Sequence, residues 1–433
     1  MTRITCHPHQ SKIRAFSDPE NFDVLQYGSR YESKSGLSIG NKLFGRIKRL
    51  GSQVSQEAID FLSISIGVTA ADTFIKRDLS ADGWARQISL DIAVFDKVKW
   101  DSVKTELEAA LHFLSGDMWE LAFSTGGLKA PQPYMPPCRT KLLNLTPCDS
   151  VCLFSGGLDS TIGVLELLQT NHKPALVSHS YPKDKAKQLA IHKHLPQVLP
   201  LFAASLNPNA PYAAETSMRS RSINFLAFGA IVASALSKLN AGATIPLYIP
   251  ENGFIALNPP LTTRRLGSLS TKTTHPHFLS AIQSIFNKVG LPVELINPFE
   301  HMTKGEMVSR HQDNEVLAEV AFDTVSCGKW KRKNMQCGRC VPCLIRRASF
   351  HAAEIEDFTP YREKDLHRAF KYEQDKDDIL AMLLASKGTR YKNMDTWLSL
   401  SGPLPENRDP YLDVLQRGLA EVREYLKHEG FVV

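Results

Sequence analysis

Polar and apolar residues follow different periods in successive parts of the chain. From Ile88 to Val94 every second residue is apolar, which predicts a half-buried strand. From Val103 to Leu114 apolar residues recur every three or four positions, which predicts an amphipathic helix. Residues 118–123 then predict another strand.

The region around these elements is predicted to form a small domain of its own. Residues 1 to about 50 are polar and rich in turn formers, so we expect them to be irregular. Asp101 or Ser102 is expected to cap the helix. Residues 1–130 are therefore predicted to form an N-terminal α+β accessory domain, and they carry no catalytic signature.

A proline-rich segment separates this domain from the rest of the chain. Residues 128–140 hold four prolines, and we expect a linker over residues 131–147. Two short apolar runs follow, residues 151–154 and 174–180, and each leads into turn residues or a helical pattern. This order predicts βαβ units and a parallel sheet.

Later segments extend the same pattern. Residues 221–239 predict a strong helix, and residues 245–251 predict another buried strand. Residues 148–352 are expected to form the main α/β domain, and residues 353–433 to form a C-terminal helical region.

Composition places the chain among ordinary globular proteins. Of its 433 residues, 43% are hydrophobic and 22% are charged, so it can bury a large core without disulfides. The net charge of +6 fits a protein that handles anions, but the charges are spread out, so a nucleic-acid partner is not favoured. The N-terminus lacks the apolar segment of a signal peptide, and no apolar run approaches about eighteen residues. We expect a cytoplasmic protein with no membrane partner.

A glycine-rich turn lies between the apolar run 151–154 and a helical pattern. It reads Ser-Gly-Gly-Leu-Asp-Ser and occupies residues 155–160. Paired glycines let backbone N–H groups approach an anion, and the following helix presents the positive end of its dipole. The hydroxyls of Ser155, Ser160 and Thr161 add donors. The segment predicts a phosphate-binding loop, with a simple capped glycine turn as the alternative.

The turn has neither the G-x-x-x-x-G-K-[ST] nor the G-x-G-x-x-G pattern. It resembles instead the PP-loop of the N-type ATP pyrophosphatases, which implies that it grips the β,γ-pyrophosphate of ATP during attack on the α-phosphate. The ATP site implied by this resemblance comprises Phe154, Ser155, Gly156, Gly157, Leu158, Asp159, Ser160 and Thr161. The resemblance also implies that Ser178 and His179 lie near the adenine.

Four of the eight cysteines lie within seventeen residues, in the order C-x9-C-G-x-C-x-x-C. They are Cys327, Cys337, Cys340 and Cys343. Closely spaced cysteines of this kind predict a structural Zn²⁺ site in which protein ligands fill all four positions. An iron–sulfur cluster and four free thiols are the alternatives. The other cysteines are expected to be structural: Cys6, Cys138, Cys148 and Cys152.

The phosphate loop and the cysteine cluster occur together in the 7-cyano-7-deazaguanine synthase family, which residues 148–352 resemble. Further matching stretches are residues 220–228, residues 297–307 and Arg346, the arginine that follows the cysteines. The resemblance implies a PP-loop parallel sheet with helices on both faces. It implies an AMP-forming ligase that uses ATP and Mg²⁺ to adenylate 7-carboxy-7-deazaguanine before ammonia attacks. The catalytic residues implied are Asp159, Arg221 and Lys304.

Simpler interpretations of the same residues stay open. Thr303 and Glu306 form a T-x-x-E capping box that starts a helix, which does not exclude a role for Lys304. Arg221 is alternatively an ordinary surface arginine, and Arg346 with its neighbour a solvated pair.

The chain also departs from the compact synthases. Their substrate-recognition stretch is absent, and a long segment rich in hydroxyl and basic residues stands in its place, residues 250–278. Long loops on such a core are commonly functional. Four residues of this segment are predicted to bind substrate: Glu251, Asn252, Arg264 and Lys272.

The extra N- and C-terminal regions resemble those of extended synthase-like proteins from Qat-type anti-phage defence clusters. Because the recognition stretch differs, an alternative to ammonia as the nucleophile is an amine of a partner protein from the same cluster, which would become conjugated to the deazaguanine. An alternative of another class is a zinc-containing RNA-binding module without catalysis, favoured slightly by the basic residues 329–333.

Overall fold

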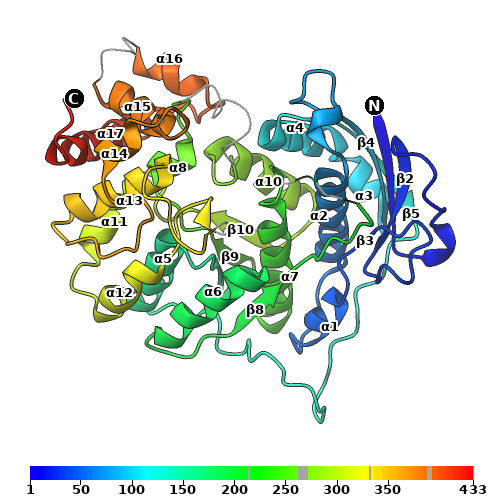
Figure 1. The fold of residues 1–433 in the computed structure, drawn as a ribbon. Helices are drawn as coiled ribbons and strands as arrows, with labels where there is room; N and C mark the ends of the chain where they lie inside the picture. Colours follow the sequence, from blue (N-terminus) through cyan, green and yellow to red (C-terminus); the bar gives the residue numbers. More distant parts are fainter. Residues whose placement is uncertain are drawn as a thin grey trace.

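The computed structural model describes residues 1–212, 215, 217, 219–261, 272–330, 333–387 and 393–432. Two five-stranded sheets organise this part of the chain, in the orders β3-β2-β1-β4-β5 and β10-β9-β6-β7-β8 (Figure 1). Every strand pair in both sheets is parallel. The α/β class predicted from the sequence is thus confirmed, and the sheet of the N-terminal unit is itself parallel.

The first sheet lies in the N-terminal part of the chain. Its strands are β1 (Thr2–His7), β2 (Asn21–Gln26), β3 (Ser38–Ile39), β4 (Gln87–Val94) and β5 (Met118–Thr125). The predictions of β4 and β5 are confirmed, but the prediction that the first fifty residues are irregular is wrong. In β1, buried Ile4 and Cys6 alternate with more exposed polar residues, and β1 pairs on both sides with β2 and β4.

Helices of the N-terminal unit lie between its sheet and the rest of the protein. They are α1 (Leu43–Lys48), α2 (Gln56–Phe74), α3 (Lys97–Asp101) and α4 (Lys104–Ser115). The predicted amphipathic helix is present, but its predicted cap is wrong. Asp96 caps α3 by accepting from the Lys99 N–H at 3.1 Å, and α4 starts after Val103 without a side-chain cap.

The second sheet has helices on both faces, as predicted. Its strands are β6 (Ser150–Leu153), β7 (Pro174–His179), β8 (Leu201–Ala204), β9 (Ile245–Tyr248) and β10 (Val293–Ile296). The helices that connect them include α5 (Leu158–Gln169), α6 (Pro182–His194), α7 (Ile223–Leu239) and α10 (Pro276–Val289). Residues of α7 share a core with Val151 and Leu153, whereas residues of α5 share another with Cys152. The strand order reverses between β6 and β9, so the carboxyl ends of these strands are the expected ligand position.

One continuous apolar core joins the two sheets. Nearly every residue of α2 is buried, because this helix packs against β4 on one side and α7 on another. Residues 126–149, which contain the predicted linker, form no helix or strand.

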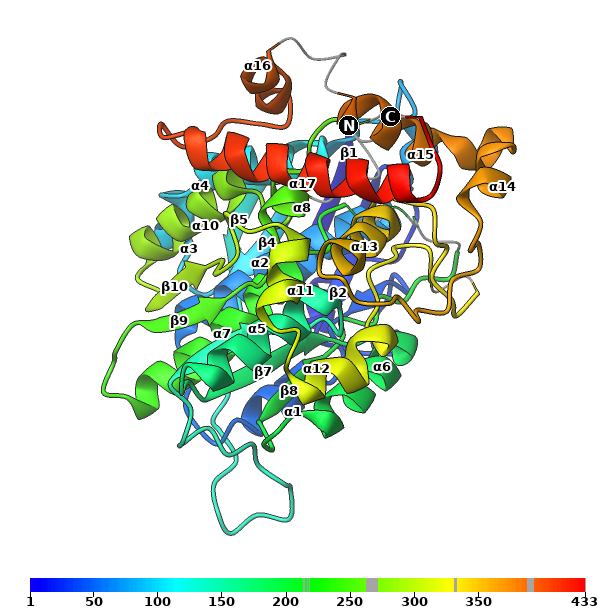
Figure 2. The same ribbon diagram turned by 90° about the vertical axis from the view of Figure 1, so that its left-hand side faces the viewer.

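The remaining helices form a second layer beside the main sheet. They are α8 (Gly253–Leu257), α11 (Lys304–Arg310), α12 (Glu315–Val320), α13 (Val341–Ala352), α14 (Leu366–Phe370), α15 (Glu373–Ser386), α16 (Met394–Ser399) and α17 (Asp409–His428). Short 3-10 turns occupy Gln10–Lys12, Arg77–Leu79 and Ala321–Asp323. Figure 2 shows α17 crossing in front of α8 and α13, with which it shares an apolar core. None of the helices in the described ranges is both long and apolar enough to cross a membrane.

Candidate active site

The glycine-rich turn connects the end of β6 to the start of α5. Gly156 has a φ of +78°, a backbone conformation that favours glycine. The Gly157 N–H donates to Ser155 Oγ at 3.2 Å, and the hydroxyl oxygens of Ser155 and Ser160 lie 3.0 Å apart. No side chain caps α5 at Gly157, so the positive end of its dipole faces the turn. The local geometry suits an anion.

Two segments that no motif identifies hold the turn in place. Gln188 of α6 donates from Nε2 to the Ser155 carbonyl at 3.1 Å. The Val325 N–H donates to the Gly156 carbonyl at 3.1 Å, and a Cβ on Gly157 would lie only 3.2 Å from the Val325 oxygen. The segment that leads to the cysteine cluster therefore lies against the phosphate loop.

A buried ion pair lies next to the loop. Lys304 Nζ is 2.6 Å from Asp159 Oδ1, and the two side chains are 3% and 7% exposed. Asn252 donates to Asp159 Oδ2 from its side-chain amide at 2.6 Å and from its backbone N–H at 3.1 Å. Burial acts to raise the pKa of Asp159, but the charge of Lys304 and the hydrogen bonds to this carboxylate outweigh burial and lower it. The structure thus brings together two of the three predicted catalytic residues.

Glu251 is the second carboxyl group of this cluster. Burial, and then the negative charge of Asp159, raise the pKa of Glu251 well above its usual range. Glu251 also forms a side-chain hydrogen bond with Asp159. A neutral Glu251 that donates its proton to an ionised Asp159 satisfies both groups, as expected when two carboxyls share one buried site.

Replacing Glu251 with glutamine should make the stability of the protein less sensitive to alkaline pH. The folded protein holds the Glu251 proton more tightly than the unfolded chain, so this contribution is complete below the unfolded pKa and is lost as pH rises through the raised folded value. Glutamine keeps a donor for Asp159 and cannot ionise. Urea unfolding should show a smaller fall in free energy with rising pH for the variant than for the wild type.

The matched control for this change is Glu294→Gln in β10, where the side chain is exposed. Its pH profile should follow that of the wild type. Parallel profiles for Glu251→Gln and the wild type would show that Glu251 ionises normally.

Lys304 reaches Asp159 from the first turn of α11. The Thr303 side chain accepts from the Glu306 N–H at 3.1 Å, and Glu306 accepts from the Thr303 N–H at 2.9 Å. The predicted capping box is thus confirmed. The cap fixes where α11 begins, and this in turn fixes the direction of Lys304.

Arg221 belongs to a neighbouring group at the end of β7. Its Nε lies 3.4 Å from His179 Nδ1, its guanidinium lies 3.5 Å from Asp184, and it stacks over the Tyr181 ring at 5.0 Å. The residue before it, Ser220, donates to Asp72 of α2 from its N–H and its hydroxyl at 2.8 and 2.7 Å. The N-terminal unit therefore holds the segment that carries Arg221.

Ser178, His179 and Phe154, three of the other predicted ATP residues, are buried beside the phosphate loop. Ser178 and His179 are fully buried, and the Ser178 hydroxyl donates to the Phe154 carbonyl at 2.6 Å. Phe154 is a core residue. The contact of Ser178 and His179 with adenine stays a prediction.

Three of the four residues predicted to bind substrate are described, and their contacts differ. Arg264 lies outside the described residues. Lys272 lies over the ring of Phe113 at 4.2 Å, and burial lowers its pKa. Asn252 is fully buried, caps α8 and donates to Asp159, so its polar atoms already have partners within the protein. Glu251 lies in the carboxyl cluster, and base recognition by any of these residues stays a prediction.

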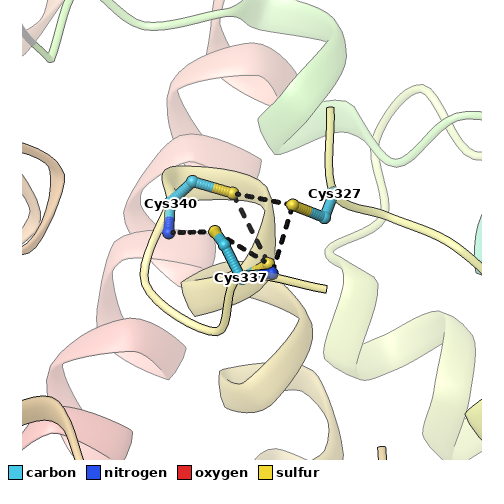
Figure 3. Close-up of side chains that lie close together, drawn as sticks. Cys327, Cys337 and Cys340 are labelled. Carbon is cyan, nitrogen blue, oxygen red and sulfur yellow. Dashed lines mark hydrogen bonds between the residues drawn. The ribbon is translucent and has the colours of Figure 1, made fainter. Parts of the chain in front are cut away.

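The four clustered cysteines form a compact group. Figure 3 shows the side chains and labels three of them, Cys327, Cys337 and Cys340. All four Sγ atoms lie within 4.8 Å of one another and all four residues are buried. Three of the separations are 3.4, 3.8 and 3.9 Å, close to the edge of about 3.8 Å expected for tetrahedral Zn–S bonds of about 2.3 Å. Backbone N–H groups of Cys337 and Cys340 donate to sulfur at 3.4 Å. The donor set fits the predicted zinc site.

Arg346 secures the segment between the cysteines and the phosphate loop. It is fully buried and donates to the Ala321 carbonyl at 2.6 Å and to Thr324 Oγ1 at 2.8 Å. Arg347 is also buried and donates to the Glu363 carbonyl at 2.6 Å. The alternative of a solvated arginine pair is therefore wrong.

Close packing in the site should make Gly163 of α5 intolerant of a side chain. A Cβ there would overlap Pro250, the residue before the carboxyl cluster. We expect Gly163→Ala to lower the free energy of unfolding by about 1–3 kcal/mol. Gly45 of α1 is the control, because nothing lies within 4 Å of its Cβ position and alanine should stabilise that helix by about 0.5–1 kcal/mol. Equal effects in thermal unfolding would contradict the packing argument.

Comparisons with known proteins agree with the motif assignment. The family model for queuosine biosynthesis protein QueC matches residues 273–354, a segment that includes Lys304 and the four cysteines. A 7-cyano-7-deazaguanine synthase of Solidesulfovibrio magneticus is 26% identical over 250 residues, which cover 50% of this chain and 97% of that protein. Synthases of Rhizobium leguminosarum and Brucella ovis are 35% and 36% identical over 22% of this chain.

The chain spans about two fifths of the length of these last two relatives, 39% and 40%. The predicted similarity to the QueC-like family is confirmed. The similarity of the terminal regions to Qat-type proteins stays a prediction.

Proposed function

We propose that the chain uses ATP to adenylate the carboxylate of 7-carboxy-7-deazaguanine. A carboxylate oxygen attacks the α-phosphate, pyrophosphate leaves, and the product is an acyl adenylate. An amine then displaces AMP and forms an amide. With ammonia as the amine, a second ATP would adenylate the amide oxygen with release of pyrophosphate, and loss of AMP and a proton would leave the nitrile. The names of the curated relatives specify this cyano product.

The observation that carries this proposal is the buried Lys304–Asp159 pair beside the glycine loop. Lysine from a distant segment supplies positive charge next to the position where the anion-binding loop would hold pyrophosphate. Positive groups preorganised in a dry site stabilise charge that develops on phosphate oxygens. Arg221 would add positive charge from the β7 side, and Mg²⁺ would accompany ATP. The cysteine group would hold Zn²⁺ as a structural ion, because four thiolates leave no open position.

The decisive experiment is incubation of the protein with ATP, Mg²⁺, ammonium and 7-carboxy-7-deazaguanine, followed by mass analysis of every product. We expect AMP, pyrophosphate and the amide or nitrile, in amounts that depend on the deazaguanine. ADP and phosphate as the products would overturn the proposal. RNA affinity without pyrophosphate release would favour the RNA-binding alternative.

The proposal also concerns which amine receives the activated deazaguanine and in which biological system the reaction takes place. The terminal regions that the compact synthases lack could dock a partner protein whose amine takes the place of ammonia, in an anti-phage defence system. A partner protein whose mass increases by the acyl-deazaguanine group would support conjugation. A free nitrile with no change in partner mass would overturn it.

A further inference from the structure

The C-terminal helix α17 contacts both connections that carry the carboxyl cluster and Lys304. Tyr411 donates to Glu300 at 2.9 Å, in the segment between β10 and α11. Gly418 packs so closely on α8 that its Cβ would lie 2.7 Å from Phe254 Cγ. Figure 2 shows this helix lying across the front of α8 and α13, with α11 below it. One helix therefore supports the chain after β9 and the chain after β10.

Glu421 makes the contact nearest to the catalytic lysine. One carboxylate oxygen, Oε1, accepts from the Thr303 hydroxyl, and the other, Oε2, accepts from the Gly305 N–H at 3.2 Å. These two donors lie on either side of Lys304 in the chain. Glu421 thus binds the backbone turn from which Lys304 extends towards Asp159.

The fit between the two helices is tight and has a second polar link. A Cβ on Gly305 would overlap the Glu421 carboxylate, so this carboxylate would have to move if residue 305 carried a side chain. Arg417, one turn earlier in α17, forms an ion pair with Glu306 and donates to the His301 carbonyl at 2.9 Å. Burial raises the pKa of Glu421 to about 7, against the opposing effect of the two hydrogen bonds that it accepts. The two hydrogen bonds place the carboxylate between α17 and the first turn of α11.

We propose that Glu421 is a positioning residue, which orients Lys304 against Asp159 through Thr303 and Gly305 and makes the phosphate site depend on the C-terminal helix. This inference rests on the proposed function, because it assigns Lys304 to the phosphates of ATP. Misplacement of a catalytic group by about 1 Å can cost about 10²-fold in rate, so a contact outside the site can control it.

The test compares Glu421→Gln with Glu424→Gln in the full-length protein. The native carboxylate accepts hydrogen bonds at both oxygens, whereas glutamine has a single acceptor oxygen. Its NH₂ group would face either the Thr303 hydroxyl or the Gly305 N–H. Both of these groups are donors, so one of the two hydrogen bonds would be lost. Glu424 is on the same helix, is 53% exposed, and pairs only with residues of α17 among the described contacts. We expect kcat for pyrophosphate release to fall about tenfold in Glu421→Gln, with KM for ATP within about twofold of the wild type. Glu424→Gln should match the wild type.

A second measurement needs no turnover. ATP with Mg²⁺ should slow amide hydrogen exchange in the wild type over residues 303–310, and this protection should be weaker in Glu421→Gln. Equal protection in the two proteins, or a kcat unchanged in Glu421→Gln, would overturn the positioning role. The exchange measurement requires ATP but no deazaguanine. It therefore tests the positioning role of Glu421 even if the wild type does not adenylate the deazaguanine.

Discussion

Replacing Lys304 with methionine should lower the rate of pyrophosphate release by about 10²- to 10³-fold, the usual effect of removing a preorganised charge-stabilising group. Methionine keeps much of the length and volume of lysine but removes its charge. Lys304 is almost fully buried and pairs with Asp159 at 2.6 Å, so water cannot readily replace it. The rate should be measured as pyrophosphate release under saturating ATP and 7-carboxy-7-deazaguanine.

The same change leaves Asp159 buried without its cation, which can destabilise a protein by about 3–5 kcal/mol. The double variant Lys304→Met with Asp159→Asn removes both charges and should recover most of the lost stability. We expect it to remain inactive, which separates catalysis from folding. Lys427→Met provides a surface control, because Lys427 is 48% exposed on α17. Normal pyrophosphate release from a folded Lys304→Met protein would contradict the proposed role.

Sequence patterns predicted the parts of the site that are local in the chain. The turn at residues 155–160 was recognisable because its glycines, hydroxyls and following helix are adjacent. The same holds for the cysteine spacing and for the capping box at Thr303. The capping box predicted where α11 begins, because a helix must begin where its first N–H groups find acceptors, and the structure adds that Lys304 in this first turn reaches Asp159.

Local sequence patterns could not predict the contacts that join distant segments of the chain. Strand β1 has a short alternating pattern, and it becomes a strand because β2 and β4 pair with it on both sides. Helix α2 is buried on nearly all sides, so it lacks the one-sided periodicity that identifies a surface helix. Glu421 is 118 residues from Thr303, and only the packing of α17 on α11 brings them together.

Asn252 has a structural role that its position in the sequence did not indicate. It lies in the segment that replaces the synthase recognition stretch, so the sequence suggested base recognition. In the structure it caps α8 and donates to Asp159. A polar residue at the end of a strand is as useful for joining loops as for contacting a ligand, and a single sequence does not distinguish the two uses.

Replacing Cys343 with serine should remove the metal and destabilise the protein by about 3 kcal/mol or more, because metal binding to such a site is coupled to folding. Cys343 is fully buried, and its sulfur lies 3.4 Å from that of Cys340 and 3.9 Å from that of Cys337. Serine is a poor zinc ligand and cannot complete the sulfur tetrahedron. Metal analysis should find about one zinc per wild-type chain and a strongly reduced content in the variant.

The effect should reach the phosphate loop, because the segment before Cys327 provides the Val325 N–H that binds the Gly156 carbonyl. Loss of the metal should therefore weaken ATP binding as well as lower the unfolding temperature. Cys138→Ser is the matched control, since Cys138 is exposed and lies outside the cysteine group. It should retain zinc, stability and ATP affinity. Zinc retained by Cys343→Ser would show that Cys343 is not a ligand. If the wild type held no zinc and the variant unfolded at the wild-type temperature, the four cysteines would be buried thiols that contribute packing alone.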